Sequence, residues 1–285
     1  MSVQITTAFV EQYKANVLML AQQHESRLAG AVRQESVKGK ACFVERIGAV
    51  DMVDAASRHD DTPQIDTPHS RRKLTTITSR YADMVDNADK VRMLISPESS
   101  YAIAGAAAAN RKKDDRIITA LTGNSYGGVA GATTIALPSA QKIAHGSAGM
   151  TLAKLIEAKE ILDAAEIDDD NRHIVMAAGQ IADLLNNTTV TSADYNTVKA
   201  LVRGQINEFM GFTFHRSQRL GTDATPSRQV VAFHRDSIVM GVGMDTIARI
   251  SERSDKNYSV QVFLEVDVGA TRVQEEGVVE IACNE

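Results

Sequence analysis

A polar segment between two strand-like segments constrains the fold of this chain more than any other feature. Residues 41–47 and 74–81 are rich in β-branched residues and threonine, which favour strands. Residues 57–73 are nearly all polar and include two prolines, so they cannot bury themselves in a core. We therefore predict a long two-stranded hairpin over residues 41–84 that projects from the body. Because an isolated hairpin is only marginally stable in water, we expect another copy of the protein to cover it.

Charged residues are distributed over both arms of this predicted hairpin. Asp60, Asp61 and Asp66 lie on one arm, and the basic run of residues 71–73 lies on the other. A loop of this kind can lie on a neighbouring subunit and exchange ion pairs, each worth about 0–1 kcal/mol when exposed. We predict that the inter-subunit interface includes Arg58, Asp60, Asp61, Asp66, Arg71, Arg72 and Lys73.

The N-terminal region predicts an amphipathic helix over residues 6–29, which Gly30 would end. Val10, Tyr13 and Val17 recur at helical spacing with polar residues between them. Two interpretations stay open. The helix packs on its own domain, or it forms an N-terminal arm that packs on a neighbouring subunit. In the second case its apolar side chains belong to the inter-subunit interface.

A single long helix is predicted over residues 97–122. Ser96 is suited to cap it, Pro97 to occupy its first position, and Gly123 to end it. Its length would be about 38 Å at 1.5 Å per residue. The alanine run at 106–109 allows another element to approach closely. We expect this helix to form a spine across a flat subunit.

The rest of the chain alternates shorter helices and strands. Its pattern predicts helices over 151–165, 179–185 and 194–201, and strands over 172–176, 212–215, 230–235, 260–268 and 279–283. Gly269 is expected to end the strand over 260–268. The acidic run at 168–170 is expected to be a solvated turn, because it lacks the glycine and the final glutamate of a calcium-binding EF-hand loop.

The sequence offers little catalytic chemistry. It contains no glycine-rich phosphate-binding loop with its lysine, and no serine or cysteine in a nucleophile motif. His59 and Asp60 suggest one rival function, a metal-dependent cytosolic hydrolase, although they lie in a proline-bounded loop and the other histidines show no ligand spacing. We therefore predict a protein that is not an enzyme, with no metal or other cofactor.

Net charge, cysteine content and hydropathy limit the class of protein and the compartment in which it is made. A formal net charge of −5 argues against a protein whose main task is to grip DNA, although such a chain can face DNA across solvent. Cys42 and Cys283 are expected to be free thiols in a reducing cytosol. No apolar run approaches the about 18 residues that span a membrane, and the first residues do not form a secretory signal. We expect a soluble protein made in the cytoplasm.

Several local sequences, together with the order of predicted elements, resemble the major capsid proteins of tailed bacteriophages. Residues 152–167 and 172–176 are similar to that family's helix, short acidic turn and R-x-x-V strand. Residues 181–185 fit the helix that follows, 211–217 resemble a late strand of the A-domain, and 228–238 resemble the return to the P-domain. The resemblance is diffuse but covers nearly the whole chain.

The resemblance implies an α+β chain with the tailed-phage major capsid fold. Its expected parts are an N-terminal arm at 1–40, an extended β-hairpin called the E-loop at 41–86, a P-domain at 87–150 with the spine helix 97–122, a mostly A-domain region at 151–227, and return strands of the P-domain at 228–285.

The resemblance also implies a function. The chain would self-assemble, as pentamers and hexamers, into the icosahedral shell that encloses the double-stranded DNA of a tailed phage. The expected partners are other copies of the chain, a portal protein, and scaffolding or decoration proteins, with no sequence-specific DNA binding and no membrane. A shell of the same fold that encloses protein cargo is a further alternative. No motif identifies a covalent crosslink.

Overall fold

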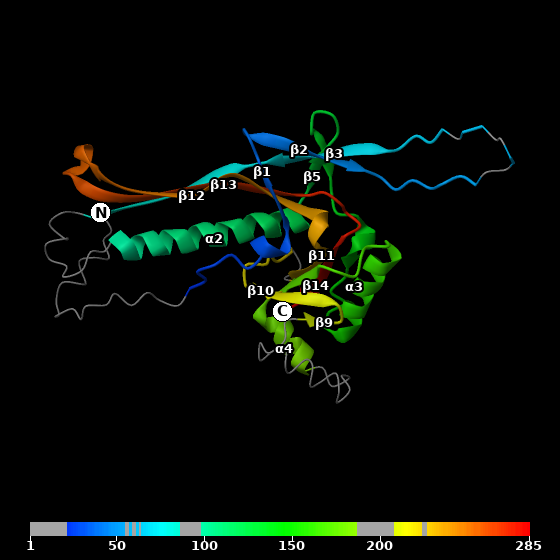
Figure 1. Cartoon of the computed structure of the whole chain (residues 1–285). Helices are drawn as coiled ribbons and strands as arrows, with labels where there is room; N and C mark the ends of the chain where they lie inside the picture. Colours follow the sequence, from blue (N-terminus) through cyan, green and yellow to red (C-terminus); the bar gives the residue numbers. More distant parts are fainter. Residues whose placement is uncertain are drawn as a thin grey trace.

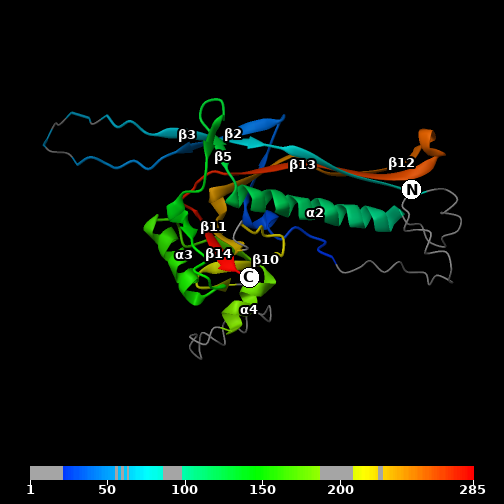
Figure 2. The ribbon, with the colours of Figure 1, turned by 180° about the vertical axis from the view of Figure 1, so that it is seen from behind.

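The computed structural model describes residues 22–54, 57–58, 61–62, 64–85, 98–186, 208–223 and 227–285. A flat layer of long strands runs along the helix α2 (Glu98–Thr122), and a smaller unit that contains α3 (Leu152–Ala164) and α4 (Ala178–Asn186) lies below one end of that helix (Figures 1 and 2). The strands are β1 (Arg33–Ser36), β2 (Ala41–Ile47), β3 (His69–Thr75), β4 (Ile77–Val85), β5 (Ser125–Gly127), β6 (Thr133–Ile135), β7 (Lys142–Ile143), β8 (Arg172–Met176), β9 (Glu208–Phe209), β10 (Phe212–Arg216), β11 (Ser227–His234), β12 (Ile238–Arg253), β13 (Ser259–Arg272) and β14 (Val278–Asn284).

The predicted long helix is confirmed, and it packs against a four-stranded sheet in the order β1-β12-β13-β4. Gly105 lies where the helix approaches the sheet most closely. A Cβ atom there would stand 2.6 Å from Leu264 Cδ1 and 2.9 Å from Tyr81 Cδ1. Ala109 packs on Val266 and Val268 in the same layer. The small residues of the helix therefore permit the close approach that the alanine run predicted.

The strand predicted over 260–268 is longer than expected. Its alternating valines are buried as predicted, but β13 continues through Gly269 to Arg272. Glycine is required at this position because a Cβ atom would stand 2.0 Å from the carbonyl oxygen of Thr75. The prediction that Gly269 ends the strand was wrong, since this glycine marks a close crossing of two strands and not a turn.

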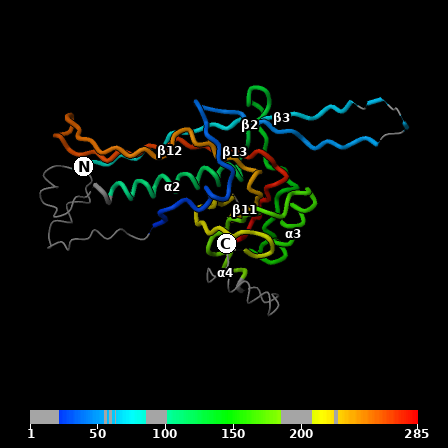
Figure 3. Tube along the Cα trace, viewed as in Figure 1, coloured from blue at the N-terminus to red at the C-terminus, as the bar shows by residue number. Residues whose placement is uncertain are grey.

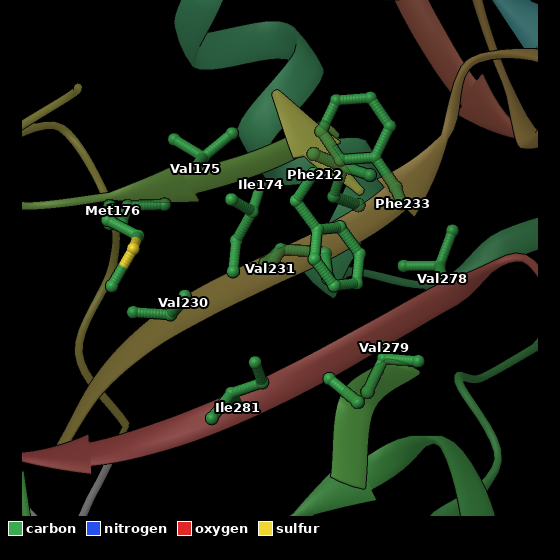
Figure 4. Packing of buried hydrophobic residues seen from close by; sticks show 14 of the residues in the cluster. Ile174, Val175, Met176, Phe212, Val230, Val231, Phe233, Val278, Val279 and Ile281 are labelled. Atoms are coloured by element: carbon green, nitrogen blue, oxygen red, sulfur yellow. The ribbon is translucent and has the colours of Figure 1, made fainter. Parts of the chain in front are cut away.

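A six-stranded sheet in the order β7-β14-β11-β8-β10-β9 holds the largest hydrophobic core. The predicted strand 172–176 and the helices near 151–165 and 179–185 all form here, and the side chain of Thr151 caps α3 by accepting from the backbone N–H of Lys154 at 3.3 Å. Figure 4 shows how the buried side chains of neighbouring strands meet: Ile174, Val175, Met176, Phe212, Val230, Val231, Phe233, Val278, Val279 and Ile281.

The predicted hairpin is present, but its second strand is divided. β2 pairs with β3 from Ala41↔Thr75 to Ile47↔His69, in a sheet of order β2-β3-β5-β6. The chain then changes sheets at Thr76, whose hydroxyl donates to Asp267 at 2.8 Å, and continues as β4 beside β13. One segment thus joins two sheets. The hairpin β2–β3 and the hairpin β12–β13 extend from the body in opposite directions (Figure 3).

The strands of the C-terminal third are divided between two sheets. β12 and β13 belong to the four-stranded sheet that packs against α2, whereas β11 and β14 are hydrogen-bonded to each other and belong to the six-stranded sheet. The return region expected at 228–285 therefore contributes to both units. Of the other predicted elements, the helix at 194–201 and the capping residues Ser96 and Pro97 lie outside the described residues.

The end of the predicted N-terminal helix is wrong. Residues 22–28 are not helical, because the buried carboxylate of Asp114 on α2 accepts hydrogen bonds from the backbone N–H groups of Arg27 and Leu28, both at 3.2 Å, and from the hydroxyl of Ser26 at 2.6 Å. These contacts hold the segment along α2. The rest of the predicted helix lies outside the described residues.

Removal of this carboxylate is expected to destabilise the subunit. In Asp114→Ala the two backbone donors and the hydroxyl lose their buried acceptor, which costs about 1–3 kcal/mol in the free energy of unfolding. Asp115→Ala is the matched control, because its ion pair with Arg219 is partly exposed and is worth about 0–1 kcal/mol. Urea unfolding of the unassembled chain measures both. Equal losses in the two variants would contradict this role of Asp114.

Two adjacent histidines give the second prediction. His173 on β8 and His215 on β10 lie 3.2 Å apart, Nδ1 to Nε2. Burial, and then repulsion from His215, lowers the pKa of His173 to about 4. In the unfolded chain His173 has a pKa near the ordinary value of 6.5, so between pH 6.5 and about 4 the unfolded chain binds a proton that the folded chain does not. The free energy of unfolding is therefore at its full value above pH 6.5 and decreases as the pH falls toward 4.

We expect His173→Gln to reduce this pH dependence. The difference in unfolding free energy between pH 7 and pH 4.5, measured by urea titration, should be smaller in this variant than in the unchanged chain. His69→Gln, at an exposed position, is the control. Parallel stability curves for His173→Gln and the unchanged chain would show that the pair does not govern acid sensitivity.

Candidate assembly surfaces

The hairpin is attached to the body through a buried carboxylate. Glu275, which is 5% exposed, accepts hydrogen bonds from Arg72 Nη2 at 2.9 Å and Arg72 Nε at 3.3 Å. Arg46 Nη1 donates to the same side chain at 3.2 Å, and the hydroxyl of Ser125 donates at 3.3 Å. Both strands of the hairpin and β5 therefore converge on one carboxylate in the turn between β13 and β14.

A fully buried arginine continues this network to the end of the spine helix. Arg272 Nη1 donates to the carbonyl oxygens of Leu121 at 3.0 Å and Gly123 at 2.8 Å, and Nη2 donates to that of Ile135 at 3.2 Å. Burial lowers the pKa of Arg272, although Glu275 opposes the shift. The carbonyls at a helix C-terminus carry partial negative charge, so they suit a guanidinium. The network fixes the hairpin base relative to α2.

The alternation of β3 decides where the predicted basic residues lie. Arg72 and Leu74 point into the body and are buried, while Arg71, Lys73 and Thr75 are on the opposite face. The prediction that Arg72 is a surface residue of the interface was wrong, because its guanidinium is satisfied by Glu275 inside the subunit.

Arg71 and Lys73 remain on the outward face of the hairpin. Arg71 pairs with Glu45 across the two strands at 3.0 Å, and its guanidinium stands 5.4 Å from the ring centroid of Phe43. Lys73 lies opposite Phe43 in the ladder and is partly exposed. These contacts make a charged and aromatic patch near the base of the hairpin.

Beyond its paired strands the hairpin has no cover from its own chain. Every described residue from Ile47 to His69 is exposed, including the predicted interface residues Arg58, Asp61 and Asp66. Asp60, with its neighbour His59, lies outside the described residues, as do the predicted arm residues Val10, Tyr13 and Val17.

The exposed part of the hairpin carries apolar side chains that the sequence-based prediction missed. Met52 is 98% exposed, and the others are Ile47, Val50, Val53 and Ile65. The signal in the sequence is the dense apolar spacing from 47 to 53, which lies outside the polar residues 57–73. An apolar group of this kind on a projecting loop indicates a surface that is covered in an assembly.

In the described part of the chain there is neither a cluster of metal ligands nor a disulfide. No three histidine, cysteine, aspartate or glutamate side chains in this part of the chain gather in a way that could hold a metal ion. Cys42 and Cys283 are free thiols. Among the described helices, none combines the length and apolar character needed to cross a membrane.

The family described as phage capsid protein matches residues 5–285. The chain belongs to that family. No curated protein matches the chain.

Solved phage structures share the fold of this capsid protein over nearly its whole length. The capsid of Ralstonia phage GP4 is similar with a TM-score of 0.77 at 10% identity, over 96% of this chain and 95% of that chain. The capsid of cyanophage P-SCSP1u gives a TM-score of 0.75 at 14% identity, over 99% and 95%. Mycobacterium phage Che8 gives 0.67 at 21% identity, over 96% and 97%.

These findings confirm the predicted fold and the predicted function as a major capsid protein of the virion. The family and the fold point to a structural protein that assembles into a shell, and no finding favours the hydrolase or the cargo compartment. The confirmed identity gives the exposed hairpin a clear context, because a shell subunit has neighbours on every side.

The two adjacent arginines of β3 give a sharp test of the buried network. Arg72→Glu removes one partner of Glu275 and places a second carboxylate beside it, so we expect a loss of about 3–5 kcal/mol in unfolding free energy. Arg71→Glu changes an exposed pair and should cost about 0–1 kcal/mol. Urea unfolding of the unassembled subunit compares them. Similar losses for the two would contradict the assignment of Arg72 to the interior.

Proposed function

We propose that this protein self-assembles, as pentamers and hexamers, into the icosahedral shell that encloses the double-stranded DNA of a tailed phage, and that it catalyses no reaction. Its hairpin lies on a neighbouring subunit in that shell. The observation that carries the proposal is the projecting hairpin, whose described residues from 47 to 69 are all exposed and include five large apolar side chains.

The energetics of the hairpin support association with a neighbour. Burial of exposed apolar side chains contributes about 25 cal/mol per Å² removed from water, whereas exposed ion pairs contribute little. The covered surface is therefore expected to be apolar at Val50, Met52 and Val53, with Arg58, Asp60, Asp61 and Asp66 supplying charge at its rim. Arg71 and Lys73 supply the charge at the base.

The N-terminal arm is the second proposed contact. The hydrogen bonds of Asp114 direct the chain along α2 as far as Gln22, whose side-chain oxygen accepts from Arg111 Nη1 at 2.9 Å. We propose that Val10, Tyr13 and Val17 pack on a neighbouring subunit, which is one of the two interpretations of their amphipathic spacing.

The other partners follow from the proposed shell. A portal protein, and scaffolding or decoration proteins, are expected to contact it. The chain is expected to be made in the host cytoplasm, and the DNA inside is expected to be enclosed without sequence-specific contacts. The formal net charge of −5 supports this, because tight binding to phosphates requires an excess of basic residues.

Electron microscopy of the expressed chain tests the proposal. The unchanged protein should form shells, tubes or capsomers in negative stain. Met52→Asp with Val53→Asp should remain folded but unassembled, because the covered apolar surface is lost while no buried residue is changed.

Ile156→Asp is the matched control, since Ile156 is a half-exposed apolar residue on α3, away from the hairpin. It should assemble as the unchanged protein does. Normal particles from the doubly substituted hairpin would disprove the role of the hairpin, and an unchanged chain that stays monomeric under all conditions would count against self-assembly.

A further inference from the structure

A cavity of about 380 Å³ opens beside the base of the hairpin, between β3, the C-terminal part of α2 and β13. Its lining includes two basic side chains, Lys73 and Arg116, with Thr119 and Asn124 as neutral polar groups. None of the described residues that line it is acidic. The composition of the lining is that of a site for an anion.

The two cations of this cavity have no counter-ion among the residues that the structure describes. In the described part of the chain, no carboxylate forms an ion pair with Lys73 or Arg116, and the Nε atom of Arg116 is buried with no hydrogen-bond partner. The stem of Lys73 packs against Gly131, where even a Cβ atom would stand 2.5 Å from Lys73 Cδ. A buried donor without an acceptor is uncommon in native structures and indicates a missing partner.

The rim of the cavity presents apolar surface that a ligand would have to cover. Ile77 and Tyr126 both line it, and each remains about half exposed, at 50% and 48%. The fitting ligand therefore carries negative charge beside apolar groups. A free phosphate or the phosphates of a nucleic acid would satisfy the cations but would leave the apolar rim uncovered.

One exposed segment of the chain has the complementary pattern. Residues 51–54 read Asp51-Met52-Val53-Asp54, all four are exposed, and no basic side chain in the described residues pairs with either aspartate. In its own subunit this segment lies far from the cavity. Asp54 is eleven residues along the hairpin from Phe43, the partner of Lys73, which is up to roughly 36 Å of extended chain.

We propose that the cavity lined by Lys73 and Arg116 receives the carboxylates of residues 51–54 from the hairpin of a second copy of this chain. Asp51 and Asp54 neutralise the two cations, and the apolar side chains between them cover the rim. This inference rests on the proposed function and identifies the receiving site for the hairpin. Arginine and lysine bind carboxylates through charge-assisted hydrogen bonds, which supply register as well as attraction.

Charge exchange between the two sites tests the pairing. Lys73→Glu with Arg116→Glu should reduce the yield of shells at least tenfold. Asp51→Lys with Asp54→Lys should do the same. The chain that carries all four substitutions should recover most of the yield. Far-UV circular dichroism establishes that each variant is folded, and sedimentation with negative-stain microscopy gives the yield.

A matched control separates specific pairing from net charge. Asp168→Lys with Asp170→Lys changes two exposed aspartates on the turn after α3 by the same amount. Combined with the two changes in the cavity, it should not restore assembly. The inference would be overturned if this control restored the yield of shells equally well. It would also be overturned if the variant with only Lys73→Glu and Arg116→Glu formed normal shells. Shells that form normally but lose enclosed nucleic acid would assign the cavity to phosphate and would also overturn it.

If the variant with Lys73→Glu and Arg116→Glu does not fold, a crosslinking experiment tests the pairing instead. Chains with Asp54→Cys are mixed with chains carrying Lys73→Cys, assembled, and oxidised. A disulfide-linked pair of chains is expected on a non-reducing gel. When Asp168→Cys chains replace the Asp54→Cys chains in the mixture, no linked pair is expected. Absence of the link in assembled shells would contradict the pairing but not the proposed function, which fails only if the unchanged chain does not assemble.

Discussion

The buried contact between Glu275 and its arginines is the interaction on which the arrangement of the subunit depends. A buried carboxylate alone would be strongly destabilising, and so would the guanidinium of Arg272. Both buried charges have partners, because Glu275 accepts from both hairpin strands and the Nη atoms of Arg272 donate to the carbonyls that end α2. The network therefore sets the direction of the hairpin relative to the helix. A projecting loop that must meet a neighbour at a defined place needs such a rigid base.

The same network explains why the sequence-based prediction placed Arg72 wrongly at the interface. Arg71, Arg72 and Lys73 look equivalent as a basic run, yet a strand sends alternate side chains to opposite faces. Leu74 had to be buried, so Arg72, two positions earlier, pointed the same way. That parity was available from the sequence. Its partner Glu275 was not, because the two lie about two hundred residues apart in the chain.

Elements with strong local signals could be predicted, and those defined by distant contacts could not. The spine helix has alanines within and a glycine after it, and it was found almost to the residue. The strand β12 was missed because Gly241 and Gly243 interrupt its pattern. Both are required by tertiary contacts, since a Cβ atom would stand 2.5 Å from Leu74 Cδ2 at the first and 2.4 Å from Asp267 Oδ2 at the second. The arm segment near Ser26 likewise follows Asp114 and not its own helical spacing.

The groups that stabilise the subunit and the groups that we propose contact its neighbours thus lie in different parts of the chain. Arg72, Arg272 and Glu275 are buried at the base of the hairpin, where each has partners within the subunit. The hairpin beyond residue 47 has apolar and acidic groups without cover, and the cavity beside the base has cations without a counter-ion. The exposed apolar side chains and the buried Nε of Arg116 are unfavourable in an isolated subunit, and we propose that both are relieved when subunits meet. A shell built this way needs no strong single contact, because many weak and complementary ones, repeated by symmetry, favour the closed assembly while misplaced subunits can still leave.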